Sequence, residues 1–295
     1  MNKKILVTGS SGQLGLSLRN RVSRFDNYEF IFIDRDILDF NDPESIARFF
    51  ERKDFDAIVN CAAFTVVDKA ELEPDIANNI NHLSVAEIAK VAKERNIALV
   101  HISTDYVFDG STSIPYSEDD DVCPVNVYGK TKLDGELAVK KYNPKGVIVR
   151  TSWVYSEYGN NFVKTMIDLA GRHKEVNVIF DQVGGPTYAG DLAEVILHLL
   201  QSGTVFKLDS SDSLYHFSNE GVASWYDLAC AVFEISAINC EVKPIETKEY
   251  ITEAVRPNFS VLNKSRIKRE FNLEINHWRR SLGLCLNKIK SKSDI

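Results

Sequence analysis

The sequence predicts a doubly wound α/β protein, in which helices cover both faces of a parallel sheet and a smaller mixed α/β lobe follows. In the first half of the 295 residues, short apolar runs alternate with segments of helical spacing, as in successive strand–helix–strand units. The apolar runs are continuous, which is typical of strands buried on both faces. A glycine-rich turn follows the first run and opens a helix, an order typical of nucleotide-binding α/β sheets.

Strands and helices are expected to alternate through the first 150 residues. The apolar runs predict strands over residues 5–8, 30–33, 57–59, 97–102 and 146–150. Helical spacing predicts helices over residues 14–22, 43–50, 74–95 and 127–141. At the start of the second helix, Asp42 is expected at the N-cap and Pro43 at the first helical position.

The pattern is less regular in the second half, which we interpret as the smaller lobe. Helices are expected over residues 161–171, 191–201 and 225–234, and strands over 176–180 and 215–217. We therefore expect a dinucleotide-binding domain over residues 1–152, with a return to its sheet around 185–220. Residues 153–295 are expected to form mainly the substrate-binding lobe.

Charge and composition exclude several kinds of partner. The formal net charge is −7, which disfavours nucleic acid because its phosphates require clustered basic residues. The basic run at 263–269 is interpreted as a solvated helix face. The five cysteines are scattered without a Cys-x-x-Cys pair, so neither a zinc site nor a disulfide framework is indicated. No apolar stretch is long enough for a membrane span, and we expect a cytoplasmic protein.

The glycine-rich turn has the composition that a dinucleotide phosphate requires. Gly9 permits a tight exit from the first strand, and Gly12 lets the backbone approach a pyrophosphate. Gly15 allows the following helix to pack closely against the sheet. Together with the strand–turn–helix context, these residues predict a Rossmann-like dinucleotide site.

The end of the second strand bears on the choice of cofactor. Asp34 can bind the ribose 2′-hydroxyl of NAD, whereas the adjacent Arg35 can meet the 2′-phosphate of NADP. The two residues argue in opposite directions, so both cofactors remain open at this point. Asp39 and Phe40 follow and are expected near the adenine, although a polar turn with an anchoring aromatic explains them equally well.

A Tyr-x-x-x-Lys pair at the start of a helix suggests proton transfer to a carbonyl oxygen. The spacing places Tyr128 and Lys132 on one helix face. We expect the Lys132 ammonium to lower the pKa of the Tyr128 phenol, so that it can protonate an oxygen as hydride arrives at carbon. Thr104 lies near the carboxyl end of the fourth strand, where ligands of open α/β sheets bind. Its hydroxyl is expected to hydrogen-bond the substrate oxygen.

Several longer motifs carry a family resemblance over nearly the whole chain to about residue 265. The chain resembles the extended short-chain dehydrogenase/reductases and, within them, the dTDP-4-dehydrorhamnose reductase family. The matching motifs are Thr8–Gly15, Val59–Glu71, Ser103–Gly110, Asn126–Lys132, Arg150–Tyr155, Gly159–Phe162, Asp181–Thr187 and Arg256–Pro257. The resemblance implies NADPH- or NADH-dependent reduction of the C4 keto group of dTDP-4-dehydro-6-deoxy-L-mannose to dTDP-L-rhamnose, a precursor of cell-surface polysaccharide.

The resemblance also implies roles for individual residues. Tyr128 would be the proton donor, Lys132 its pKa partner and nicotinamide-ribose anchor, and Thr104 the partner of the substrate oxygen. The dinucleotide would be lined by Gly12, Gln13, Leu14, Asp34, Asp39, Phe40, Ala63, Phe64, Thr65 and Ile102. The nucleotide sugar would be contacted by Asp105 and Trp153, with Val67 close by and Arg256 near the pyrophosphate.

Two departures from the family pattern affect other expectations. Ser17 and Gly190 stand where relatives that dimerise through magnesium have glutamates, and these residues cannot supply carboxylate oxygens. A magnesium-bridged dimer is therefore not expected, which leaves a monomer or a metal-independent homodimer. Phe64 stands where some relatives have histidine.

Three other functions are weighed on the same scaffold. A reductase that gives the C4 epimer, dTDP-6-deoxy-L-talose, could use the same residues. A non-catalytic subunit would resemble the member of this family that binds methionine adenosyltransferase, but Thr104, Tyr128 and Lys132 are intact. Dehydratases of this fold share a Thr-Asp-Glu segment, and here the segment is Thr104-Asp105-Tyr106. The missing glutamate favours the reductase.

Overall fold

A six-stranded parallel sheet forms the centre of the protein. The computed structural model describes residues 2–51 and 53–293. All neighbouring strands of this sheet pair in parallel, which confirms the predicted doubly wound α/β class. In spatial order the strands are β10 (Leu214–His216), β5 (Gly146–Thr151), β4 (Ala98–Thr104), β3 (Ala57–Asn60), β1 (Lys3–Thr8) and β2 (Tyr28–Phe32).

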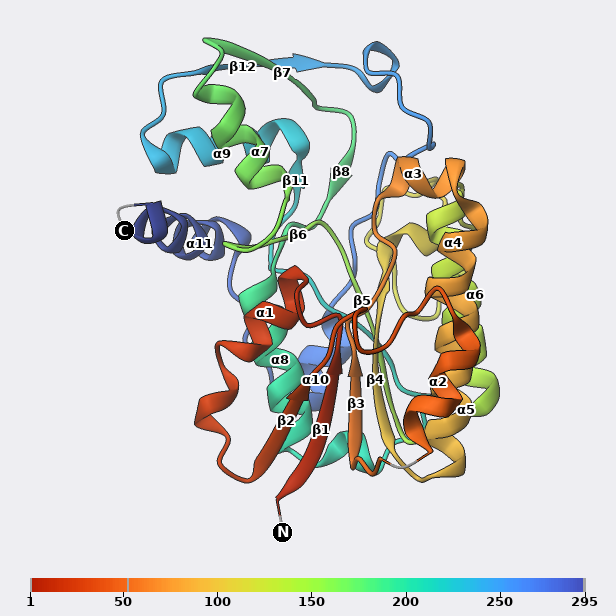
Figure 1. Ribbon diagram of the computed structural model, residues 1–295. Coiled ribbons are helices and arrows are strands. Elements are labelled where there is room, and N and C mark those ends of the chain that lie inside the picture. The colour runs from red at the N-terminus through yellow and green to blue at the C-terminus, as the bar shows by residue number, and fades with distance from the viewer. Residues whose placement is uncertain (1, 52, 294–295) are drawn as a thin grey trace.

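Helices cover both faces of the sheet, giving three layers (Figure 1). One face packs against α1 (Gln13–Arg19), α8 (Ala189–Gln201) and α10 (Ser265–Phe271). The other packs against α2 (Pro43–Phe50), α5 (Ser84–Glu94) and α6 (Val127–Tyr142). Successive residues of β1 point to opposite faces, so Ile5 joins the first of these cores and Leu6 the second. Both faces are buried, which explains the continuous apolar runs.

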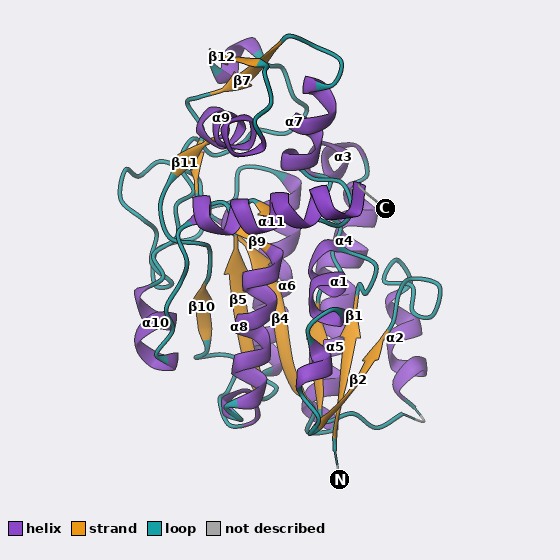
Figure 2. Ribbon diagram, turned by 90° about the vertical axis from the view of Figure 1, so that its left-hand side faces the viewer, coloured by secondary structure: helices purple, strands orange, loops and turns teal. Residues whose placement is uncertain are grey.

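A smaller lobe lies beyond the carboxyl ends of the strands (Figures 1 and 2). Its core is a third buried cluster, to which α7, α9, α11 and the β7–β12 pair contribute. The helices are α7 (Phe162–Ala170), α9 (Trp225–Ser236) and α11 (Trp278–Ser293). The paired strands are β7 (Glu175–Ile179) with β12 (Glu241–Ile245), β6 (Val154–Tyr155) with β9 (Thr187–Tyr188), and β8 (Val183–Gly184) with β11 (Ala223–Ser224).

The helix expected over residues 74–95 is interrupted. It consists of α4 (Pro74–Asn78), a π-helical turn over Asn79–Leu83, and α5. A π turn changes which side chains face inward, and here Asn81 is fully buried. A short helix that the sequence analysis did not predict, α3 (Val67–Leu72), precedes α4.

Other helix boundaries also differ from the prediction. The helix expected over residues 14–22 ends at Arg19, where the Asn20 side chain donates to the Leu16 carbonyl at 2.9 Å. Asp42 occupies the N-cap of α2 as expected, but its side chain pairs with Arg48 at 2.9 Å instead of capping the helix. Single 3₁₀ turns complete the fold at Val22–Arg24, Asp105–Val107, Thr204–Phe206 and Thr247–Glu249.

The basic run at 263–269 and the five cysteines can also be placed in the fold. Much of the basic run lies in α10, where Arg266 pairs with Asp119 and Lys268 pairs with Glu220 at 2.6 Å. None of the five cysteines forms a disulfide bond. Within residues 2–51 and 53–293, no helix combines the length and the apolar character that a membrane crossing needs.

Candidate active site

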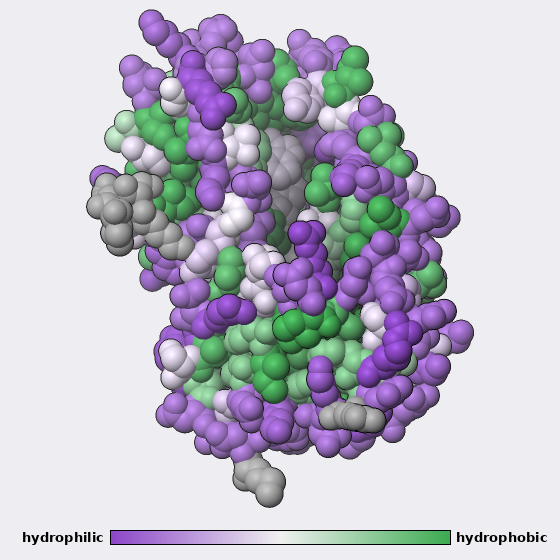
Figure 3. All heavy atoms as spheres, in the orientation of Figure 1, coloured by the Kyte–Doolittle hydropathy of each residue, from purple (hydrophilic) through white to green (hydrophobic). Residues whose placement is uncertain are grey.

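A large cavity lies at the carboxyl ends of the central strands, beneath the smaller lobe. Its volume is about 1110 Å³, and the surface in Figure 3 is hollowed between the lobe and the helices beside it. The structure brings every residue predicted for catalysis, cofactor or substrate to this one cavity. They are Gly9, Gly12, Gln13, Leu14, Gly15, Asp34, Arg35, Asp39, Phe40, Ala63, Phe64, Thr65, Val67, Ile102, Thr104, Asp105, Tyr128, Lys132, Trp153 and Arg256.

The glycine-rich turn is as tightly packed as its composition suggested. Gly9 has a φ of +61°, and a Cβ there would lie 2.8 Å from the Ala62 backbone. A Cβ on Gly15 would lie 2.4 Å from the Gly9 carbonyl oxygen. Gln13, which directly follows Gly12, reaches the second half of the protein and donates to the Val154 carbonyl at 3.3 Å. The turn therefore lies at the junction between the sheet and the lobe.

Polar groups at the end of β2 form the other end of the cavity. The Asp34 carboxylate accepts from the Arg35 N–H at 2.7 Å, and hydrogen bonding with Ser11 lowers its pKa. Asp39 accepts from the Asn41 N–H at 2.8 Å. The carbonyl of buried Phe40 accepts from the Ser84 hydroxyl at 2.6 Å. Asp34 and Arg35 thus lie side by side, with both a carboxylate and a guanidinium available to a ribose.

The loop after β3 is held by a residue that the sequence analysis missed. Asn81, in the π turn, accepts from the Phe64 N–H at 2.9 Å and donates to the Phe64 carbonyl at 3.1 Å. The same amide donates to the Thr131 hydroxyl of α6 at 3.2 Å. It therefore ties the loop of Ala63, Phe64 and Thr65 to the helix that carries Tyr128 and Lys132. No feature of the sequence indicated the π turn that brings Asn81 to this position.

Tyr128 and Lys132 project from the first turns of α6. The Asn126 side chain caps this helix by accepting from the Gly129 N–H at 2.8 Å. Lys132 is 2% exposed and donates to the Ile102 carbonyl at 2.6 Å. Burial lowers the Lys132 pKa to about 8, because a charged ammonium is disfavoured away from water.

The predicted lowering of the Tyr128 pKa by Lys132 is wrong for this structure. Burial raises the pKa of Tyr128 to about 12, and the opposing effect comes from a hydrogen bond with Thr104. The Lys132 ammonium is directed at the Ile102 carbonyl, so its charge is partly satisfied elsewhere. The phenol therefore keeps its proton at neutral pH and is available as a donor.

Thr104 and Asp105 form a polar pair next to Tyr128. The Thr104 hydroxyl donates to Asp105 Oδ1 at 3.0 Å and accepts from the Tyr106 N–H at 3.2 Å. Asp105 is 2% exposed, and its Oδ2 has no hydrogen-bond partner among the described residues. Burial raises the Asp105 pKa to about 6. Asp105 lines the cavity, but Oδ2 itself is buried, so it would meet a ligand hydroxyl only after the side chain turned toward the cavity.

Trp153, Trp225 and Arg256 also line the cavity, and each takes part in a close side-chain contact. The Trp153 ring stacks on Trp225, a residue that the sequence analysis missed, with centroids 3.5 Å apart. Arg256 binds both carboxylate oxygens of Asp68, at 3.0 and 2.6 Å. The guanidinium thus lies at the cavity with part of its hydrogen-bonding capacity used by Asp68.

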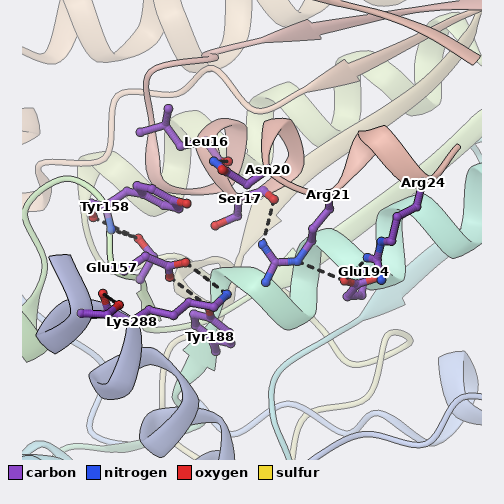
Figure 4. Close-up of polar contacts among 12 residues, drawn as sticks. Leu16, Ser17, Asn20, Arg21, Arg24, Glu157, Tyr158, Tyr188, Glu194 and Lys288 are labelled. Atoms are coloured by element: carbon purple, nitrogen blue, oxygen red, sulfur yellow. Dashed lines mark hydrogen bonds and ion pairs between the residues drawn. The ribbon is translucent and has the colours of Figure 1, made fainter.

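The residues beside α1 do not fit a magnesium site (Figure 4). Ser17 is fully buried, and a Cβ on Gly190 would lie 2.3 Å from the Tyr188 ring. The nearby carboxylate of Glu157 already accepts from the Tyr188 hydroxyl at 3.0 Å and pairs with Lys288 at 3.3 Å. The Glu157 carboxylate is therefore already neutralised by an ammonium, which makes it a poor ligand for a divalent cation. No cluster of metal-binding side chains occurs in the part of the chain that the structure describes.

This fold and site define a nicotinamide-dependent oxidoreductase of the short-chain dehydrogenase/reductase type, with the glycine-rich turn and the side chains of Thr104, Tyr128 and Lys132 around one cavity. The family described as "RmlD substrate binding domain" matches residues 3–291, and the chain belongs to it.

Individual relatives are similar over almost their whole length. A dTDP-4-dehydrorhamnose reductase of Aggregatibacter actinomycetemcomitans is 39% identical over 285 residues, covering 95% of this chain and 97% of the relative. The crystal structure of such a reductase from Clostridium acetobutylicum has a TM-score of 0.91 and 39% identity, covering 97% of this chain and 99% of the other. Another, from Bacillus anthracis in complex with NADP, has a TM-score of 0.91 and 35% identity, covering 98% and 100%.

Proposed function

We propose that this protein reduces the C4 keto group of dTDP-4-dehydro-6-deoxy-L-mannose to dTDP-L-rhamnose, using NADPH or NADH, in the cytoplasm. The observation that carries the proposal is that Thr104, Tyr128 and Lys132 line the same cavity as the glycine-rich turn. The names of the relatives supply the substrate class. The product would serve the synthesis of cell-surface polysaccharide.

The chemistry follows from the protonation states of the site. When bound, NADPH or NADH would provide the hydride that reduces the sugar C4. Tyr128 holds its proton, because its pKa is raised to about 12, and gives it to the sugar O4 as negative charge develops there. In the bound state the Thr104 hydroxyl would turn its proton from Asp105 Oδ1 to the same oxygen, and the Lys132 ammonium, which donates to the Ile102 carbonyl, would stabilise the phenolate through its charge. The Asp105 carboxylate would accept from a sugar hydroxyl once its buried Oδ2 turned toward the cavity.

The two ends of the cavity divide the remaining roles. Residues 1–152, with the return at 185–220, would hold the dinucleotide through the glycine-rich turn, Asp34, Arg35 and the loop of Ala63, Phe64 and Thr65. Residues 153–295 would mainly bind the nucleotide sugar, with Trp153 against the sugar and Arg256 near the pyrophosphate. Because the residues beside α1 do not fit magnesium, the assembly would be a monomer or a metal-independent homodimer.

Cofactor preference is proposed to depend on Arg35. The Bacillus anthracis relative was crystallised with NADP. Arg35 lines the cavity beside Asp34, and a guanidinium suits a 2′-phosphate. We therefore propose that NADPH is the better reductant.

The test is oxidation of NADPH in the presence of dTDP-4-dehydro-6-deoxy-L-mannose, with the product identified by NMR. We expect dTDP-L-rhamnose, and the C4 epimer dTDP-6-deoxy-L-talose would overturn the stereochemical assignment. Cofactor binding without turnover on this or any related keto sugar would instead favour the non-catalytic regulatory subunit. The Tyr128→Phe protein is the matched control, since it removes only the hydroxyl.

A further inference from the structure

Trp153 has an unusual backbone conformation. Among the described residues, the non-glycine residues with positive φ are Asn96, Asn143, Trp153, Ala237 and Asn272. Asn143, Ala237 and Asn272 are helix C-caps, and Asn96 lies just after α5, so each ends a helix in the usual left-handed way. Trp153, with φ of +46°, instead lies between strands β5 and β6. A bulky residue keeps such a conformation only when its surroundings enforce it.

The surroundings of Trp153 enforce this conformation from two sides. Its ring lies parallel to that of Trp225, 3.5 Å away at an interplanar angle of 3°. A Cβ on Gly184 would lie 2.6 Å from Cε2 and 2.7 Å from Nε1 of Trp153, so only glycine fits against that side of the indole. The Trp153 carbonyl is also fixed, because it accepts from the Thr187 N–H at 3.1 Å.

The sheet register relates Trp153 to the catalytic edge. Thr104 of β4 is the register partner of Thr151 of β5. Trp153 follows two residues later, so it leaves the sheet beside Thr104 and Asp105. Trp225, by contrast, is the first residue of α9 in the lobe, and Phe162 of α7 packs against it with centroids 4.7 Å apart. The stacked pair therefore connects the lobe to the edge that carries the reacting groups.

We propose that Trp225 is a positioning residue that, together with Gly184, fixes Trp153 as a rigid wall of the sugar subsite. This inference rests on the proposed function, since it takes the ligand to be a nucleotide-linked 6-deoxyhexose. The carbonyl carbon must be held near Thr104 and Tyr128, and an indole fixed beside them restricts the rotation of the sugar ring. In this proposal the wall contacts the sugar rather than the nucleotide or the dinucleotide.

The test compares Trp225→Leu and Gly184→Ala with two matched controls. Gly283→Ala lies in α11, where an added Cβ meets nothing within 4 Å. Trp278→Phe removes a buried indole of the lobe core that does not line the cavity. For each protein, KM and kcat are measured for the keto sugar and NADPH. The Kd values for dTDP-L-rhamnose and for dTDP alone are measured by calorimetry on NADP⁺-loaded protein.

Both test variants should raise KM for the sugar and Kd for dTDP-L-rhamnose by about tenfold or more, since a misplacement of about 1 Å can cost a hundredfold. KM for NADPH and Kd for dTDP should change less than about twofold, and both controls should resemble wild type. Equal weakening of dTDP and dTDP-L-rhamnose, or no change in either, would overturn the inference.

A third Trp225 variant and the wild-type turnover distinguish failure of the positioning role from failure of the proposed function. Trp225→Phe retains a stacked ring, so it should give an intermediate Kd and provides a folded variant if Trp225→Leu is unstable. If wild type reduces no keto sugar yet the calorimetric pattern holds, the proposed function fails while the positioning role stands. If turnover is found and the variants bind dTDP-L-rhamnose like wild type, the positioning role fails alone.

Discussion

Asp105→Asn should make the protein more stable and less active at neutral pH. Asp105 is a buried carboxylate, 2% exposed, and its hydrogen bonds with Ser260 and Thr104 only partly offset the effect of burial. Folding must therefore remove a charged group from water without full compensation. The amide keeps the oxygen that accepts from Thr104 and carries no charge. The cost of the charge is thus removed while the local hydrogen bond remains.

The size of the effect follows from the pKa. Burial raises the Asp105 pKa from 3.8 to about 6, which corresponds to about 3 kcal/mol against the folded state once the group is ionised. Below pH 3.8 both states are protonated and the penalty is absent. As pH rises from about 4 to 6, the unfolded chain loses its proton first, so wild-type stability falls. Above pH 6 the penalty is complete and constant.

Urea denaturation of wild type and Asp105→Asn between pH 4 and 8 measures this directly. The variant should gain up to about 3 kcal/mol at pH 8 and almost nothing at pH 4. Asp109→Asn is the control of opposite sign, because hydrogen bonds from Ser111 and Tyr116 lower the Asp109 pKa and its removal should destabilise the protein at neutral pH. Parallel wild-type and Asp105→Asn curves across the whole range would refute the reasoning.

Other predictions concern activity. Wild-type kcat/KM should fall below pH 6 as Asp105 is protonated, and Asp105→Asn should lack this limb while being slower throughout. Wild-type kcat/KM should also fall above pH 8, because the buried Lys132 ammonium loses its proton near that value. Lys132→Arg should abolish this alkaline limb in whatever activity remains. Tyr128→Phe should lower kcat by about 10²- to 10⁴-fold with unchanged NADP⁺ affinity by calorimetry. Arg35→Ala should raise KM for NADPH by about tenfold and leave KM for NADH nearly constant in steady-state assays.

The fold was predictable because the pattern that produces it is local. Short β-branched runs such as residues 147–149 are typical of strands covered on both faces, and β5 has every residue buried. The glycine-rich turn was predictable for a similar reason, since Gly9 needs a positive φ and a Cβ on Gly15 would meet the Gly9 carbonyl in the same turn. Short elements without apolar periodicity were missed, as with α3, in which only Ala70 is buried.

The parts of the site that escaped prediction depend on contacts between distant segments. Asn81 and Trp225 contact the loop after β3 and Trp153 respectively, and neither pairing leaves a spacing that a sequence could show. The prediction of a lowered Tyr128 pKa was wrong for a related reason. The four-residue spacing to Lys132 is local, but the burial that raises the pKa comes from the whole fold.

The neighbour of Asp105 separates a reductase from a dehydratase on the same scaffold. Fold alone does not fix the chemistry, and dehydratases of this fold place a glutamate where this chain has Tyr106. The Tyr106 ring packs edge-on against Tyr128, with centroids 5.7 Å apart. Burial and the Asp105 charge raise the Tyr106 pKa above its ordinary value, so the phenol stays neutral and cannot act as a carboxylate base on the sugar. With that base absent, Tyr128 and Thr104 are left to act at the carbonyl oxygen, and reduction without loss of water is the chemistry that these groups support.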